Sequence, residues 1–195
     1  MSVFWEKGFE SASITELTSA MGINSPSLYA AFESKEALLC EAVERYSQTM
    51  GSELWGALEC TAAVREAFAN YLKASATFLA RTDTPRGCFV TLGGYNETQA
   101  NEVACKVFRQ YRAEKIKRLE QRLERALAEG ELAPDTDCAS MAHYFATVQQ
   151  GMAIHARDGA KEETLRSIAH CAMAAWDNLV ANSKDNHPAG TAATI

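Results

Sequence analysis

Hydrophobic residues near the start of the chain recur at helical spacing and are then interrupted by a tight turn. Ser13 and Glu16 form an S-x-x-E capping box, which predicts that a helix begins at about residue 14. Gly22 ends this helix, because glycine readily adopts the positive φ of a turn. Ile23 is expected to fill the corner that the turn creates. The apolar residues of the helix share one face: Ile14, Leu17 and Met21.

A second short helix is predicted over residues 25–32. Asn24 is a suitable N-cap and Pro26 fits the first helical turn. Leu28 and Phe32 then form its buried face. A helix, a tight turn and a second helix at this spacing are typical of a helix-turn-helix DNA-binding motif. In such a motif the second helix enters the major groove with its N-terminal residues toward the base edges.

The rest of the chain also has helical patterns and no clear strand pattern, so the predicted fold class is all-α. A helix capped by Ser34 is predicted to run to about Leu58 and to join a DNA-binding head, residues 1–46, to a helical body, residues 47–182. The tail, residues 183–195, is predicted to be disordered. Pro, Gly and Asp separate the other predicted helices, at about 64–79, 88–92, 98–129, 137–157 and 161–181.

Composition and short motifs argue against a membrane protein, a disulfide-stabilised protein and an enzyme. The 195 residues carry a net charge of −6, and no apolar run reaches the ~18 residues that span a membrane. Six cysteines without a C-x-x-C spacing fit reduced thiols in the cytoplasm rather than disulfides or a zinc site. No phosphate-binding glycine loop, G-x-S-x-G or H-E-x-x-H motif is present, and nothing favours a catalytic pair of Cys88 with a histidine. We therefore expect no enzyme activity, cofactor or metal.

The first quarter of the chain resembles a known family. Its residues follow the pattern G-F-x-x-x-S-I-x-E-L-x-x-x-M-G-I-N-x-x-S-L-Y-x-x-F-x-S-K-E-x-L. This is similar to the N-terminal domain of TetR/AcrR-type transcriptional regulators. The resemblance implies a homodimer that binds a double-stranded DNA operator and encloses a small-molecule effector in its body.

Family members usually carry most of a further helix, often preceded by a basic arm, before the position of Phe4. We therefore expect a shortened first helix, a truncated chain or a misplaced start. Residues 1–46 also hold three basic residues against seven glutamates, a balance of −4. Because Lys and Arg supply nonspecific DNA affinity, we expect a form with upstream residues to bind DNA more tightly. The hypothesis fails if restoring those residues leaves the affinity and its salt dependence unchanged.

The DNA contacts implied by the motif fall into two groups. Phosphate contacts position the head, and base-edge contacts read the sequence. With few hydrogen-bonding side chains on the second helix, methyl contacts and DNA shape are expected to carry much of the specificity. The candidates for base-edge or groove contact are Ser25, Pro26, Ser27 and Ala30. The candidates for phosphate contact are Ser13, Thr15, Tyr29 and Lys35.

The last two predicted helices carry apolar stripes with small residues among them, a pattern suited to close helix packing. One interpretation is the internal core of the protomer. The other, which the family resemblance implies, is a four-helix dimer interface that presents two recognition helices to a pseudo-palindromic site. The candidate interface residues are Phe145, Val148, Met152, Leu165, Ile168, Ala172 and Trp176.

Aromatic residues with polar neighbours occur throughout the middle of the chain. Such a mixture suits a small-molecule pocket, although aromatic stripes at helical spacing are also typical of plain core. The family resemblance favours a pocket. Its candidate residues are Phe68, Phe89, Tyr95, Phe108, Tyr111, Tyr144 and Gln149.

Cys88 is a candidate redox or electrophile-sensing thiol. It follows Arg86-Gly87 and opens a short predicted helix, and both a helix N-terminus and a nearby Arg lower the pKa of a thiol. Cys105 is a candidate partner. The alternative interpretation is a small buried apolar side chain beside a turn. The basic stretch 106–125 could bind nucleic acid, but a solvated helix face is favoured.

These observations together favour a ligand-responsive DNA-binding regulator in the cytoplasm. A repressor released from a pseudo-palindromic operator by a small-molecule effector, with a thiol-reactive one as a candidate, is the favoured function. The alternative is a helical, dimeric interaction module of the same fold that has lost DNA binding.

Overall fold

A computed structural model describes residues 1–181 except 50, 61–62 and 95–100. Within these ranges the regular structure is entirely helical, which agrees with the predicted all-α class. The head and its connection contain α1 (Ser2–Ser11), α2 (Ile14–Met21), α3 (Ser25–Phe32) and α4 (Lys35–Thr49). The body contains α5 (Ser52–Glu59), α6 (Val64–Leu79), α7 (Phe89–Leu92), α8 (Glu102–Ala128), α9 (Cys138–Arg157), α10 (Glu162–Ala174) and α11 (Trp176–Ala181).

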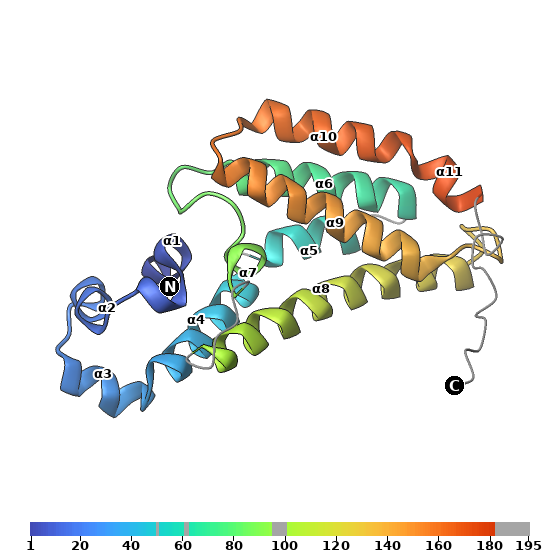
Figure 1. The fold of residues 1–195 in the computed structure, drawn as a ribbon. Helices are drawn as coiled ribbons and strands as arrows, with labels where there is room; N and C mark the ends of the chain where they lie inside the picture. Colours follow the sequence, from blue (N-terminus) through green and yellow to red (C-terminus); the bar gives the residue numbers. More distant parts are fainter. Residues whose placement is uncertain (50, 61–62, 95–100, 182–195) are drawn as a thin grey trace, which may run out of the picture.

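The head lies at one end of an elongated helical body, and α4 joins the two (Figure 1). In the body α6 packs between α5 and α10, while α8 packs against α9 and receives α4 near its N-terminal end. The short α7 lies where α4, α8 and α9 meet. The architecture therefore brings the connecting helix into direct contact with the interior of the body.

The helix-turn-helix forms where the sequence predicts it. Ser13 Oγ accepts a hydrogen bond from the Glu16 amide at 3.2 Å, and the Glu16 carboxylate accepts one from the Ser13 amide at 3.0 Å. Gly22 has φ 67° and Asn24 Oδ1 accepts a hydrogen bond from the Ser27 amide at 2.9 Å. The predicted capping box, turn and second N-cap are all confirmed.

Two apolar residues at the turn do not pack as predicted. Met21 is 41% exposed and Ile23 is 37% exposed, so neither is a core residue of the head. The buried apolar residues of the two helices are Leu17 and Leu28 instead.

Three predicted helices are interrupted. The helix predicted from Ser34 to Leu58 divides into α4 and α5, and the Gly51 amide donates to the Tyr46 carbonyl five residues earlier, at 3.1 Å. The last helix divides at Ala175, which places Trp176 in the core. Gly8 (φ 79°, ψ 170°) separates two helical pieces of α1. The predicted start of the long helix at 98 and the predicted disordered tail lie outside the described residues.

The prediction of a solvated basic face on α8 is wrong at two positions. Lys115 is 9% exposed and Arg122 is 3% exposed. Arg118 lies over the Trp55 ring, 4.2 Å from its centroid, so part of this helix's charge is used in packing. The helical pattern alone did not reveal that α8 is covered on two sides, by α4 and by α9.

Candidate DNA-binding head and effector pocket

The recognition helix α3 presents the predicted contact residues outward. Pro26, Ser27, Tyr29 and Ala30 are exposed, and Ser25 is half-buried at the helix start. Tyr29 is 47% exposed, which is unusual for a large aromatic side chain and leaves both its ring and its hydroxyl available. The exposed face of α3 therefore combines small side chains at the N-terminus with one phenol further along.

The four predicted phosphate contacts have different surroundings. Thr15 and Tyr29 are exposed. Ser13 is also exposed, but its hydroxyl is already engaged with Glu16 in the capping box, at 2.8 Å. Lys35 turns toward α1, where its Nζ donates to the Glu10 carbonyl at 3.4 Å and lies 4.6 Å above the Phe9 ring. Burial lowers the pKa of Lys35.

One of the few basic residues of the head is engaged in an ion pair. Lys7, one of its three basic residues, forms a salt bridge with Glu16. The hydrogen bond from Lys7, followed by those from Ser13, lowers the pKa of Glu16 to about 2. Glu16 is therefore ionised across the physiological range, at the positive end of α2, where a carboxylate is favourable.

Aromatic side chains hold the head against the body. Trp5 packs edge-on against Tyr46 of α4, with ring centroids 5.1 Å apart, and stacks on Phe89 of α7 at 6.1 Å. The Trp5 carbonyl also accepts a hydrogen bond from Arg157, at the end of α9, at 2.7 Å. Trp5 of α1 thus contacts α4, α7 and α9, and the sequence pattern did not predict these contacts.

A small, partly enclosed cavity of about 50 Å³ lies at the same junction. Its walls come from α4, α5, α7, α8 and α9, and its lining includes Tyr46, Ser47, Gly51, Leu54, Trp55, Cys88, Val90, Tyr111, Lys115 and Gln149. This set is mostly apolar with a few convergent polar groups, which is the composition expected of a ligand site. We call it the junction pocket.

Polar groups of the junction pocket form a buried cluster. Lys115 Nζ donates to Gln149 Oε1 at 2.7 Å and to Thr91 Oγ1 at 3.3 Å. The Tyr46 hydroxyl donates to Cys88 Sγ at 3.3 Å, and the Thr91 amide donates to the same sulfur at 3.4 Å. Sequence reasoning missed Lys115 because its position on α8 is surrounded by exposed charged residues.

Cys88 is buried, 5% exposed. Burial by itself raises the pKa of its thiol, but the Lys115 ammonium and the hydrogen bonds from Thr91 and Tyr46 outweigh that effect, so the net shift is downward. The predicted direction is confirmed, although the charge that lowers the pKa comes from Lys115 rather than from Arg86. The other candidate thiol, Cys105, is buried and donates to Asn101 Oδ1 at 3.5 Å.

The predicted ligand-binding residues fall into separate groups. Tyr111 and Gln149 line the junction pocket. Phe89 packs edge-on against Phe108 at 5.3 Å and belongs to the neighbouring core. Phe68, which is buried, and Tyr144, which is half-buried, pack against Phe145 with ring centroids 4.9 and 5.1 Å apart, and neither lines the junction pocket. Tyr95 lies outside the described residues.

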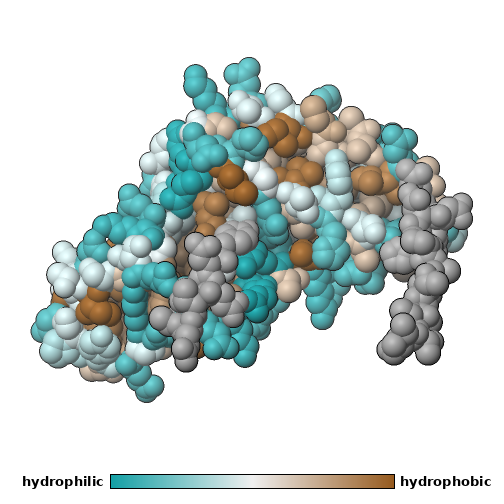
Figure 2. Space-filling view, viewed as in Figure 1, coloured by the Kyte–Doolittle hydropathy of each residue, from teal (hydrophilic) through white to brown (hydrophobic). Residues whose placement is uncertain are grey.

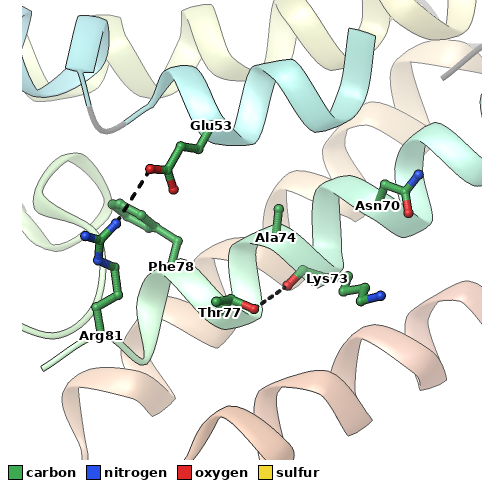
Figure 3. A pocket seen from close by; sticks show the side chains of 7 residues that line it. All are labelled: Glu53, Asn70, Lys73, Ala74, Thr77, Phe78 and Arg81. Atoms are coloured by element: carbon green, nitrogen blue, oxygen red, sulfur yellow. Dashed lines mark hydrogen bonds and ion pairs between the residues drawn. The ribbon is translucent and has the colours of Figure 1, made fainter. Parts of the chain in front are cut away.

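A larger hollow of about 410 Å³ lies on the outer side of α5 and α6 (Figure 3). Figure 3 shows Arg81 directed toward Glu53 across its edge, and their charged atoms are 3.7 Å apart. Glu53 is exposed and Arg81 is half-buried, and neither Cys88 nor Lys115 lines the hollow. The junction pocket is therefore the better candidate for an effector site, because it contacts the connecting helix.

Five of the seven predicted dimer residues are corrected to core positions of the protomer. Their side chains are at most 4% exposed, because α9, α10 and the start of α11 direct them into the core that these helices form with α6: Phe145, Met152, Leu165, Ala172 and Trp176. Val148 and Ile168 are half-buried and lie at the edge of that core. The outward faces carry other residues, including Ile154, which is 49% exposed. Figure 2 shows hydrophobic side chains among polar ones over α9 and α10.

The described residues show neither the pattern of a metal site nor that of a membrane-spanning helix. Within the described ranges no group of three or more His, Cys, Asp or Glu side chains is arranged to hold a metal ion. No helix in this part of the chain is long and apolar enough to cross a membrane.

Comparisons with known proteins agree with the helix-turn-helix head. Residues 1–42 match the family model described as bacterial regulatory proteins of the tetR family. Residues 60–171 match the model described as tetracyclin repressor-like, C-terminal domain. The two matches cover both the head and most of the body.

Two curated proteins of Escherichia coli (strain K12) are similar over most of their length. The HTH-type transcriptional repressor ComR is 34% identical, covering 92% of this chain and 86% of that protein. The HTH-type transcriptional repressor BdcR is 30% identical, covering 86% of this chain and 80% of that protein.

A solved structure is similar in both sequence and fold. It contains a cysteine-substituted form of the TetR-family regulator CifR in complex with 26-bp double-stranded operator DNA. It superposes with a TM-score of 0.87 at 36% identity, covering 90% of this chain and 92% of that one. With both family models and these relatives matched along most of its length, the chain belongs to the TetR family of transcriptional regulators.

Proposed function

We propose that the protein is a homodimeric repressor that binds a pseudo-palindromic operator and is released by an effector in the junction pocket. The observation that carries the proposal is the position of Tyr46, which contacts Trp5 of the head and Cys88 of the pocket. The names of ComR and BdcR support repression, and the CifR complex supports an operator partner. In this proposal the protein acts in the cytoplasm and catalyses no reaction.

In the proposed switch, α4 transmits a movement from the pocket to the head. An effector that needs more room than the pocket offers displaces Tyr46 and thereby moves α4, which also carries the head. In a dimer this movement changes the separation of the two recognition helices, so that they no longer match a fixed half-site spacing. The effector must bind the released state more tightly than the DNA-bound state for this shift to occur.

The proposed dimer interface uses the outward faces of α9 and α10 rather than their buried stripes. Residues at helical spacing on these faces include Thr147, Gly151 and Ile154 on α9, and Thr164, Ser167 and Cys171 on α10. Small side chains at these positions allow two copies of the helix pair to approach closely. A twofold axis through this face would place both heads on the same side.

A thiol-reactive effector is the candidate that Cys88 supports. Its lowered pKa increases the fraction of thiolate, the nucleophilic form. With an α,β-unsaturated carbonyl compound, the sulfur forms a bond to the β-carbon and the C=C π electrons form an enolate. That enolate takes a proton from the Lys115 ammonium, which then regains one from solvent, so no oxidant or reductant is needed.

The first test is selection of operator sequences from random duplex DNA at moderate salt. An enriched palindrome supports the regulator, and its half-site spacing reports the dimer. If neither this chain nor a form extended upstream enriches any sequence, the interaction-module alternative replaces the proposal.

The second test uses an operator that the selection enriches. Treatment with N-ethylmaleimide should release this DNA from the wild type but not from Cys88→Ser, with Cys60→Ser as the exposed-thiol control.

A further inference from the structure

The junction pocket contains a buried positive charge without a carboxylate partner among the described residues. Lys115 donates hydrogen bonds to two side chains, those of Gln149 and Thr91, and both are neutral. Lys115 is 9% exposed, and a buried ammonium is costly unless a negative group lies near it. The Cys88 thiol, which lines the same pocket, can become negative and interacts electrostatically with Lys115.

Two more polar groups in the same region lack partners within the described part of the chain. Gln149 Nε2, a donor, is buried and has no hydrogen-bond partner, and its residue is 1% exposed. The Tyr71 hydroxyl is also buried without a partner, and its ring stacks on Trp55, a residue of the pocket wall, at 5.7 Å. A buried donor that stays unsatisfied costs free energy, so these groups are suited to a ligand or water that accepts hydrogen bonds.

From this arrangement we infer that the junction pocket binds a small monoanion, a carboxylate with an apolar tail, whose charged group contacts Lys115 and Gln149. The inference rests on the proposed effector role of the same pocket and gives the effector a chemical class. One positive charge is balanced by one negative charge, whereas a dianionic phosphate would leave an unpaired charge in the interior.

The size and lining of the pocket place the two parts of the ligand. A cavity of about 50 Å³ accommodates a carboxylate group but not a tail. The wall beside it is apolar and aromatic, and includes Leu54, Trp55 and Val90. We therefore expect the tail to lie against this wall beside Gly51, between the end of α4 and the start of α5. Entry of such a ligand would displace the connecting helix directly.

The test measures binding of hexanoate and benzoate to the full chain without DNA, by isothermal titration calorimetry and by thermal unfolding. Hexanamide and benzamide are the matched probes, because they keep the tail and remove the charge. We expect the acids to bind and to raise Tm, and the amides to bind at least roughly tenfold more weakly, since a charge-assisted hydrogen bond is lost. Equal binding of acids and amides would overturn the inference.

Substitutions locate the anion. Lys115→Met should reduce acid binding roughly tenfold or more, whereas Lys117→Met, an exposed lysine of the same helix, should leave it unchanged. Gln149→Met gives a second variant in case Lys115→Met does not fold, and it should also weaken the acids more than the amides. Acid binding that survives both pocket substitutions would place the anion elsewhere and contradict the inference.

A third readout tests whether the anion lies beside Cys88. A bound carboxylate competes with the thiolate for the Lys115 charge, so hexanoate should slow the alkylation of Cys88 at neutral pH, and hexanamide should not. Alkylation unaffected by saturating hexanoate would count against the site. These measurements do not use DNA, so they test the anion site separately from the effector role. If the acids bind the chain but do not release operator in a separate DNA-binding assay, the anion site is supported and the effector role is contradicted.

Discussion

The hydroxyl of Tyr46 lies 3.3 Å from the sulfur of Cys88, and this hydrogen bond joins α4 to the residue that begins α7. The ring of Tyr46 also packs edge-on against Trp5. A change at Cys88 is therefore two contacts away from the head. Since α4 carries the head and lines the pocket, the same helix can transmit a local change in packing to the recognition helix.

Tyr46→Phe removes the hydroxyl and keeps the ring against Trp5. We expect the pKa of Cys88 to rise, because one of the hydrogen bonds that lower it is lost. Alkylation of Cys88 at neutral pH, followed by mass spectrometry, should therefore be slower than in the wild type. Loss of the buried hydrogen bond should cost about 1 kcal/mol of unfolding free energy. An unchanged alkylation rate would show that this bond has no influence on the thiol.

Tyr29→Ala and substitutions of Ser27 should affect DNA binding in different ways. Tyr29 is a phosphate candidate, so its loss should weaken binding to all sequences by a similar factor. Ser27 lies near the start of α3, and Ser27→Asn should change which operator sequences are enriched in a selection. Uniform effects of both substitutions on a panel of operators would mean that the assignment of contacts is wrong.

Ile154→Glu tests the proposed dimer interface. Ile154 is 49% exposed on α9, and twofold symmetry would bring a pair of glutamates to the interface. We expect dissociation to monomers in sedimentation velocity at micromolar concentration. The matched control is Val103→Glu, which changes another exposed apolar residue, 54% exposed at the start of α8. A monomeric wild type, or an Ile154→Glu variant that stays dimeric, would exclude this face.

Lys115→Met should change how stability depends on pH. Burial is the main cause that lowers the pKa of Lys115 below its usual 10.5, so the folded protein releases this proton at a lower pH than the unfolded chain. Unfolding then takes up a proton in that window, and the free energy of unfolding of the wild type rises with pH up to 10.5. The variant should lack this rise in urea titrations from neutral to alkaline pH.

The lowered pKa of Cys88 contributes a rise of the same sign. Both Lys115 forms should therefore be compared in a Cys88→Ser background, which removes that contribution. Replacing a buried charge by an apolar group is often neutral or stabilising, so we also expect Lys115→Met to be at least as stable at neutral pH. A parallel pH dependence in the two proteins would refute the assigned shift.

Glu16→Gln should make the head less sensitive to acid. The wild-type carboxyl has a pKa of about 2 when folded, below its usual 4.5, so its stabilising effect is complete above 4.5 and is lost as pH falls through about 2. The variant should lack this component in acid unfolding followed by circular dichroism. Glu41→Gln, an exposed glutamate of α4, is the control and should retain the wild-type acid transition.

Local sequence was sufficient for the helix-turn-helix. The capping box at Ser13, the turn at Gly22 and the N-cap at Asn24 each depend on residues no more than four positions apart, so each can be predicted from the sequence. Helical periodicity likewise indicated which parts of the body are helices. It did not locate the break between α4 and α5, because the apolar pattern continues across the interruption.

What lies inside and what lies outside was decided by tertiary packing. The stripe on α9 that includes Phe145 and Met152 is buried by α6 and α10, and periodicity alone cannot say whether an apolar face meets its own chain or a second copy. Lys115 is buried for the same reason, since α8 is covered by helices distant in sequence. The sequence by itself therefore determined the all-helical fold class and the helix-turn-helix motif of the regulator. The junction pocket, its buried charge and its contact with the head arise only when the helices pack together.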